Sequence, residues 1–173
     1  MGAISHPERA KLITGLFAND LDIIKKAADK LQKLFGPIDY ESRILDFIHT
    51  DYYRKEMGQD LKRKFLSFKK TVDLKNICAV KLKTNALEER FKKNGLRTVN
   101  IDPGYLDLAK LVLFSTKDYT HRIYLSRGIY AEVTLYYKDN SFQPWPWTYP
   151  DYKTDEHIGI FNEIRSLYKK GVG

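Results

Sequence analysis

Two different spacings of apolar residues open the chain. Residues 11–18 form an almost continuous apolar run, which predicts a first strand. Asn19 and Asp20 can then cap a helix, and Gly36 with Pro37 would end it. Between these limits apolar residues recur every three or four positions and define one helix face: Leu21, Ile24, Ala28, Leu31 and Phe35.

Strand and helix patterns continue to alternate after this helix. Residues 38–48 predict a second strand, residues 51–58 a polar and aromatic connection, and residues 62–69 a third strand. A second helix follows, and residues 96–101 predict a fourth strand. The order β-α-β-β-α-β is that of the ferredoxin-like split unit. We therefore predict an α+β fold with a ferredoxin-like core.

The second helix can be placed in two ways. Asp73 can cap it, and Asn94 with Gly95 would close it. Alternatively, a fresh helix begins near Thr84, with Glu88 completing a capping box. One continuous apolar stripe favours a single helix: Leu74, Ile77, Val80, Thr84, Leu87 and Phe91.

Further strands and a last helix complete the predicted fold. Residues 102–105, Asp-Pro-Gly-Tyr, predict a type II turn, with Gly104 at the positive φ position. Residues 108–116 are nearly all apolar and predict a central strand buried on both faces. Residues 117–137 predict an added antiparallel hairpin, and residues 156–169 a C-terminal helix.

The hairpin register follows from which side chains share a face. A two-residue loop would mix polar and apolar residues on both faces, whereas a three-residue loop at residues 126–128 separates them and ends in Gly128. One face is then apolar: Ile123, Leu125, Ile129, Ala131, Val133 and Leu135. The other carries Arg122, Tyr124, Tyr130, Glu132 and Thr134. This polar face is either an exposed outer surface with a cross-strand ion pair or a tyrosine-walled binding site.

Composition sets the class of protein. The chain of 173 residues fits a single domain, 1–173, with no apolar run long enough to span a membrane and no pattern of a secretory signal. Its one cysteine, Cys78, cannot form an internal disulfide, and a cytoplasmic location is expected.

The net charge of +8 comes from one segment. Residues 54–97 hold 14 Lys and Arg against 5 Asp and Glu, whereas the rest of the chain holds 16 against 17. This segment is either a solvated helix face or a surface for phosphates, on nucleic acid or on a small ligand.

Familiar catalytic motifs are absent from the sequence. It has no phosphate-binding loop, dinucleotide fingerprint, zinc-protease motif, serine-hydrolase elbow or EF-hand loop, and its four histidines are far apart. Nothing signals haem, flavin or an iron–sulfur cluster. A divalent metal held by carboxylates is the one cofactor left open.

Charged residues near the ends of the later strands are the candidates for chemistry. The candidate catalytic residues are Asp102, Asp118, His121 and Glu132. The candidate ligand-binding residues are Arg63, Lys110, Lys117, Arg122, Tyr124, Tyr130 and Thr134. Lys110 interrupts a buried strand and needs a partner, for which Asp102 or Glu132 is expected. A purely structural ion-pair network would explain the same residues.

Prolines and aromatic residues alternate in residues 142–152. Because proline blocks ladder pairing, we expect an extended segment over the surface. It either covers an apolar face or forms a wall of the ligand site or a docking surface for a partner.

Several strings together resemble a known family: YYRKEMG, KLKTNALEERF, VNIDPGYL, KLVLFSTKDYTHRIYLSRGIYAEVTLYY and PWTYPDY. The chain is similar over about residues 10–170 to a prokaryotic family catalogued as a domain of unknown function, number 4416. Some members carry the label "GTP-binding protein". The resemblance implies no catalytic residue.

Two functional hypotheses follow. The first is a protein that binds a phosphorylated or nucleotide-like small ligand, with hydrolase or transferase activity as an extension. The second is an RNA-binding or accessory module that uses the basic segment and exposed tyrosines. The sequence leaves the oligomeric state open.

Overall fold

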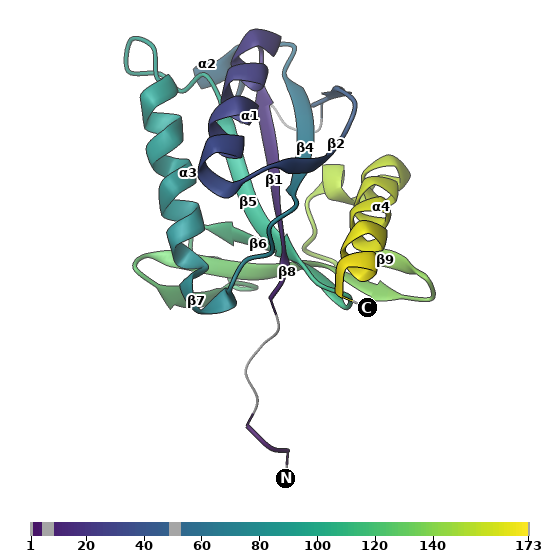
Figure 1. The fold of residues 1–173 in the computed structure, drawn as a ribbon. Coiled ribbons are helices and arrows are strands. Elements are labelled where there is room, and N and C mark those ends of the chain that lie inside the picture. The colour runs from purple at the N-terminus through teal and green to yellow at the C-terminus, as the bar shows by residue number, and fades with distance from the viewer. Residues whose placement is uncertain (1, 5–8, 49–52, 173) are drawn as a thin grey trace.

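A nine-stranded antiparallel sheet forms the centre of the computed structural model, which describes residues 2–4, 9–48 and 53–172 (Figure 1). Its strands are β1 (Lys11–Ala18), β2 (Ile38–Glu41), β3 (Leu45–Asp46), β4 (Lys62–Phe68), β5 (Asn100–Leu106), β6 (Lys110–Ser115), β7 (Ile123–Ser126), β8 (Ile129–Lys138) and β9 (Ser141–Pro144). The order is β2-β4-β1-β5-β6-β8-β7, with β3 on β4 and β9 on β8.

The helices are α1 (Leu21–Phe35), α2 (Arg54–Met57), α3 (Cys78–Phe91) and α4 (Asp155–Val172), with 3-10 turns η1 (Leu74–Asn76) and η2 (Pro150–Lys153). These elements confirm the predicted α+β class. Helices α1 and α3 pack on one face of the sheet and α4 on the other (Figure 1). No helix in the described ranges has the length and apolar character needed to cross a membrane.

Two apolar layers stabilise the sheet. On the α1 and α3 side the core includes Leu16, Leu31 and Ile101, and on the α4 side it includes Phe65 and Phe161; all five are fully buried. Burying each such side chain contributes roughly 1.5–3 kcal/mol.

Both predicted helices of the core are present, although α3 begins at Cys78 and Asp73 caps the separate 3-10 turn η1. Asp20 caps α1, because its carboxylate accepts a hydrogen bond from the Asp22 N–H at 2.8 Å. The buried face of α1 is rotated from the expected one, since Ile23 and Ala27 are buried and Leu21 is exposed. Helix α3 runs through Thr84 without a break, as the continuous stripe predicted.

The predicted turn at residues 102–105 is wrong, because these residues belong to β5. Strand β5 begins at Asn100 and pairs with β1 through Leu106. Gly104 is needed for a different reason than a positive φ: a Cβ at this position would lie 2.2 Å from the Val112 carbonyl oxygen of β6. The glycine therefore allows β5 and β6 to approach closely.

Strands β5 and β6 separate just beyond this contact and form a fork. They pair only from Gly104↔Leu113 to Leu106↔Leu111. Towards Asn100, β5 continues beside β1, whereas towards Ser115, β6 continues beside β8. In Figure 1, β5 runs upward while β8 runs sideways. The two halves of the sheet thus diverge and leave space between them.

The hairpin register is partly as predicted. Ile123 pairs with Ala131 and Tyr124 with Tyr130. The three-residue loop is wrong, however, because Arg127 and Gly128 form a tight turn with φ of 55° and 76°. A bulge at residue 125 adds one residue to β7, so the pairing of Tyr124 with Tyr130 is kept although the loop is one residue shorter than predicted.

The predicted continuous apolar face of the hairpin is also wrong. A second bulge follows Val133 in β8, where Val112 pairs with Val133 and Leu111 with Leu135. Ile129 therefore packs on the α1 and α3 side, whereas Leu135 packs on the α4 side. Ile123 is 73% exposed, because β7 is an edge strand.

The aromatic and proline segment was only partly predicted. Residues 141–144 form strand β9, which pairs with β8 up to Pro144↔Leu135, where an edge position tolerates proline. The connection expected over residues 51–58 lies partly outside the described residues, and its described end forms α2.

Candidate functional site

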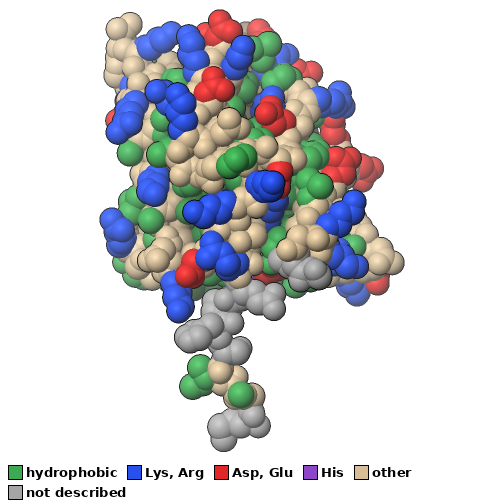
Figure 2. All heavy atoms as spheres, in the orientation of Figure 1, with side chains coloured by type: hydrophobic (Ala, Val, Ile, Leu, Met, Phe, Trp, Pro, Cys, Tyr) green, Lys and Arg blue, Asp and Glu red, His purple; other side chains and the backbone are tan. Residues whose placement is uncertain are grey.

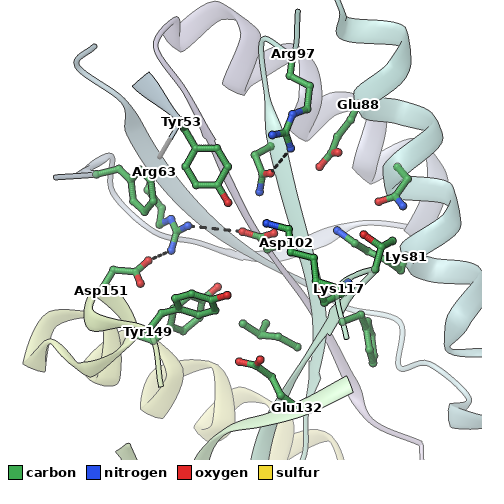
Figure 3. Close-up of a pocket in the computed structure, with 18 of the residues that line it drawn as sticks. Tyr53, Arg63, Lys81, Glu88, Arg97, Asp102, Lys117, Glu132, Tyr149 and Asp151 are labelled. Carbon is green, nitrogen blue, oxygen red and sulfur yellow. Dashed lines mark hydrogen bonds and ion pairs between the residues drawn. The ribbon is translucent and has the colours of Figure 1, made fainter. Parts of the chain in front are cut away.

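A cavity of about 610 Å³ occupies the fork between β5 and β6 (Figure 3). This volume is within the range of about 300–1,000 Å³ typical of small-ligand sites. Helix α3 forms one wall, residues 115–122 and 149–152 form the opposite wall, and Arg63 of β4 lies at the floor. Cations and carboxylates are equally represented in the lining: Arg63, Lys81, Lys92, Arg97, Lys117 and Arg122 with Glu56, Glu88, Glu89, Asp102, Glu132 and Asp151.

Five of the candidate residues from the sequence line this cavity: Arg63, Asp102, Lys117, Arg122 and Glu132. They come from β4, β5, the end of β6, the start of the hairpin and β8. The fork brings them together, although they are far apart in the sequence.

Three candidate residues lie away from the cavity. Lys110 is at the other end of β6, where its Nζ lies 2.9 Å from the Asp107 carboxylate, so the expected pairing with Asp102 or Glu132 is wrong. Tyr124 is 57% exposed and stacks edge-on against Tyr130 on the outer part of the hairpin.

The remaining candidates support or adjoin the lining residues. The Thr134 hydroxyl is buried and donates to Glu132 Oε1 at 3.2 Å. His121 Nε2 lies 3.0 Å from Glu132 Oε2, and its ring stacks on Trp147. Asp118 is exposed.

Arg63 forms the floor and is only 3% exposed. Its Nη1 contacts the Asp151 carboxylate, and its Nη2 lies 3.7 Å from Asp102. Four aromatic rings surround the guanidinium: Phe17, Phe47, Phe65 and Tyr152. Such an enclosed charge is stable only while it stays paired, so Arg63 primarily holds Asp102 and Asp151 in place.

Arg122 organises the wall opposite α3. Its Nε donates to Glu132 at 2.8 Å, and its Nη1 donates to the Ser115 hydroxyl and to the Lys117 carbonyl. Its Nη2 donates to the Tyr149 hydroxyl at 3.0 Å. Because each nitrogen already has a partner, Arg122 is placed to position its neighbours rather than to bind an anion as the sequence suggested.

Helix α3 contributes two polar side chains that bind both backbone polar groups of one residue of β5. Lys81 Nζ donates to the Ile101 carbonyl at 3.1 Å, and Glu88 Oε1 accepts from the Ile101 N–H at 2.5 Å. Burial raises the pKa of Glu88 to about 7, although Lys81 and the Ile101 N–H lower it. The Ile101 N–H and carbonyl need these partners because β6 does not pair with β5 here.

The raised pKa of Glu88 makes stability depend on pH. The usual pKa of a glutamate is about 4.5, and that of Glu88 in the folded protein is about 7. Between these two pH values the folded state binds more protons than the unfolded state, so the Glu88 carboxyl lowers the stability of the protein as the pH rises. Glu88→Gln should therefore gain stability relative to the wild type between pH 5 and pH 8, by up to about 3 kcal/mol. Urea unfolding at both pH values measures this gain. Glu89→Gln is the matched control, and an equal gain there would contradict the assignment to Glu88.

Three buried side chains of the lining have a polar atom without a hydrogen-bond partner among the described residues: Arg63 at Nε, Tyr152 at its hydroxyl, and Asn100. The Oδ1 atom of Asn100 accepts from Arg97 Nη1 at 3.1 Å, whereas its Nδ2 has no partner among the described residues. The residue is buried, with a relative exposure of 5%. An amide in this position has donors available for a ligand.

The sequence pointed to only five residues of the lining and missed most of it. Lys81 and Glu88 lie within a helix, where Glu88 was considered only as part of a capping box. Tyr149 and Asp151 fall in the aromatic and proline segment, whose alternative interpretation was a wall of the ligand site, and they do line the cavity.

A metal site receives no support from this geometry. Within residues 2–4, 9–48 and 53–172, no group of three or more His, Cys, Asp or Glu side chains is placed to hold a metal ion. Asp102, Asp118 and Glu132, the carboxylates among the candidate residues, are accordingly not grouped around one metal position.

Comparison with known proteins gives a family and no closer relative. The family model described as "Domain of unknown function (DUF4416)" matches residues 8–168. No curated protein and no solved structure matches the chain.

Proposed function

This chain belongs to the family of the domain of unknown function DUF4416, and from the cavity we propose that it binds a small phosphorylated or nucleotide-like ligand between β5 and β6. We also propose that β1, α1, β2, β4, α3 and β5 form a ferredoxin-like core. The antiparallel order β2-β4-β1-β5 supports this arrangement.

The observation that carries the ligand proposal is the Asn100 amide. A buried donor without a partner costs about 1–3 kcal/mol, so native structures rarely keep one without a reason. Asn100 Nδ2 is such a donor among the described residues, and it lines a cavity large enough for a ligand. A phosphate or hydroxyl oxygen of a ligand would satisfy it.

Two lysines lie where an anionic group would need them. Figure 3 shows Lys81 coming from α3 and Lys117 from the chain after β6, both directed towards Asp102 in the middle of the cavity. Ammonium groups on two sides of a cavity attract a phosphate. Asp102 would accept hydrogen bonds from hydroxyl or amino groups of the same ligand. Asp102 and Glu88 are also the carboxyl groups that a hydrolase or transferase reaction would use for proton transfer.

Lys117→Gln should weaken the binding of ribose 5-phosphate or adenosine monophosphate about tenfold to hundredfold, because one charge-assisted hydrogen bond is worth about 1.5–3 kcal/mol. Calorimetric titration of the full chain measures the affinity. Lys110→Gln is the matched control, since Lys110 lies outside the cavity and pairs with Asp107. Equal affinities for Lys117→Gln and the wild type, or equal losses in both variants, would contradict the proposed site.

The nucleic-acid hypothesis is the second candidate, and surface charge favours it. Figure 2 shows many Lys and Arg side chains over the face formed by α1 and α3. Exposed lysines of α1 include Lys25, Lys26 and Lys30, and Lys75 is exposed in η1, just before α3. Helix α4 packs on the opposite face of the sheet, so the apolar residues of that layer are buried rather than open to stacked bases.

A titration with single-stranded RNA separates the two candidates. Binding that weakens steeply with salt and is unchanged in Lys117→Gln would favour the nucleic-acid hypothesis over the cavity.

A further inference from the structure

Two exposed tyrosines stand on the same wall of the cavity. Tyr119 is 46% exposed and Tyr149 is 44% exposed, and both line the cavity. They come from segments about thirty residues apart, residues 115–122 and residues 149–152. Exposed aromatic rings are common when scattered singly, but two on one wall of a ligand-sized cavity call for an explanation.

One guanidinium holds both rings. The Cζ atom of Arg122 lies 4.5 Å from the centre of the Tyr119 ring, and its Nη2 donates to the Tyr149 hydroxyl at 3.0 Å. The Arg122 side chain is 4% exposed, and Glu132, itself buried, fixes its Nε. The rings are thus positioned before any ligand arrives, which lowers the entropy cost of binding.

The two positioned tyrosine rings are not needed to bind a phosphate. A phosphate would be bound by Lys81, Lys117 and Asn100 on the α3 side and near the end of β6. Two rings held in place offer flat apolar surface to a planar group, and stacking on tyrosine suits any nucleobase because every base has a π face. Asp102 lies in the same cavity and can accept from a ring N–H or an exocyclic amine.

We infer that the ligand is a nucleotide whose base stacks on Tyr119 and Tyr149, with Arg122 as the residue that positions both rings. The inference rests on the proposed function, because the lysines bind the phosphate of the ligand and the tyrosines bind the base of the same ligand. It separates a nucleotide from a sugar phosphate, which would not need the tyrosine wall.

The test compares ribose 5-phosphate with the four ribonucleoside monophosphates by calorimetric titration of the full chain. At least one nucleotide should bind about tenfold to hundredfold more tightly than ribose 5-phosphate. Tyr119→Ala and Tyr149→Ala should remove this advantage and leave the affinity for ribose 5-phosphate unchanged. Both tyrosines are exposed, so these variants should fold.

Two further variants sharpen the assignment. Tyr149→Phe keeps the ring but loses the hydroxyl that Arg122 holds, so its nucleotide affinity should lie between those of the wild type and Tyr149→Ala. Tyr124→Ala removes an exposed tyrosine outside the cavity and should change nothing.

The possible outcomes distinguish failure of the nucleotide inference from failure of the proposed phosphate-binding function. If ribose 5-phosphate binds as tightly as every nucleotide and the tyrosine variants change nothing, the inference is overturned while the phosphate site stands. If neither class binds, the proposed function fails and the inference fails with it.

Discussion

Asp151→Ala should lower the free energy of unfolding by about 3–5 kcal/mol, because it leaves the buried guanidinium of Arg63 without its nearest counter-charge. Asp102 remains at 3.7 Å, but it is partly exposed and cannot replace the direct contact. The aromatic rings around Arg63 give it no further hydrogen-bond acceptor. Urea unfolding at neutral pH measures the loss.

Two comparisons make this prediction specific. Asp46→Ala removes the partner of Lys62 at the surface, where solvent screens the pair, and should change stability only slightly. The double variant Arg63→Met with Asp151→Leu removes both charges and should be more stable than Asp151→Ala alone. A double variant less stable than Asp151→Ala would show that the ion pair is not the cause.

Gly104→Ala should cost about 3 kcal/mol, near the upper end of the usual cost of overpacking. The added Cβ would lie 2.2 Å from the Val112 carbonyl oxygen and 2.8 Å from Leu113 Cδ2. The first of these atoms is backbone, so β6 itself must move away from β5. The same movement should disturb the cavity, and the variant should also bind the phosphorylated ligands more weakly.

A second glycine variant distinguishes a steric clash of the added Cβ from the general effect of replacing glycine with alanine. Gly159 lies in α4 and has no positive φ, and an added Cβ there would have no described atom of another element within 4 Å. Gly159→Ala should therefore stabilise the helix by about 1 kcal/mol. If Gly104→Ala proved as harmless in urea unfolding, the close approach of the two strands could not be what Gly104 permits.

The sequence predicted the positions of helices and strands more accurately than which of their side chains are buried. Strand β1 is buried on both faces and is a continuous apolar run, whereas α1 and α3 each have one side against the core, so all three elements follow directly from apolar spacing. The two bulges of the hairpin were not predictable from apolar spacing. Each adds one residue to a strand, so every later side chain of that strand lies on the opposite face of the sheet from the one expected. Asp102-Pro103-Gly104 has the composition of a turn, yet pairing along the length of β1 holds it in a strand.

The candidate site was predictable in part for a related reason. Arg63, Asp102 and Glu132 are charged residues on strands, so their unusual position could be seen in the sequence. Lys81 and Glu88 look like ordinary helix residues, and only the Ile101 N–H and carbonyl, which have no partner on β6, explain why they face inward. Asp151 reaches Arg63 from a segment 88 residues away, a contact that no local pattern indicates.

The most direct test of the central claim is a nuclear magnetic resonance titration of the isotope-labelled protein with adenosine monophosphate. We predict that the largest shifts occur at the Asn100 side-chain amide and at the backbone amides of Ile101 and Lys117. Shifts confined to the lysines of α1 or to the outer hairpin around Tyr124, with the Asn100 amide unmoved at saturation, would contradict a ligand site between β5 and β6.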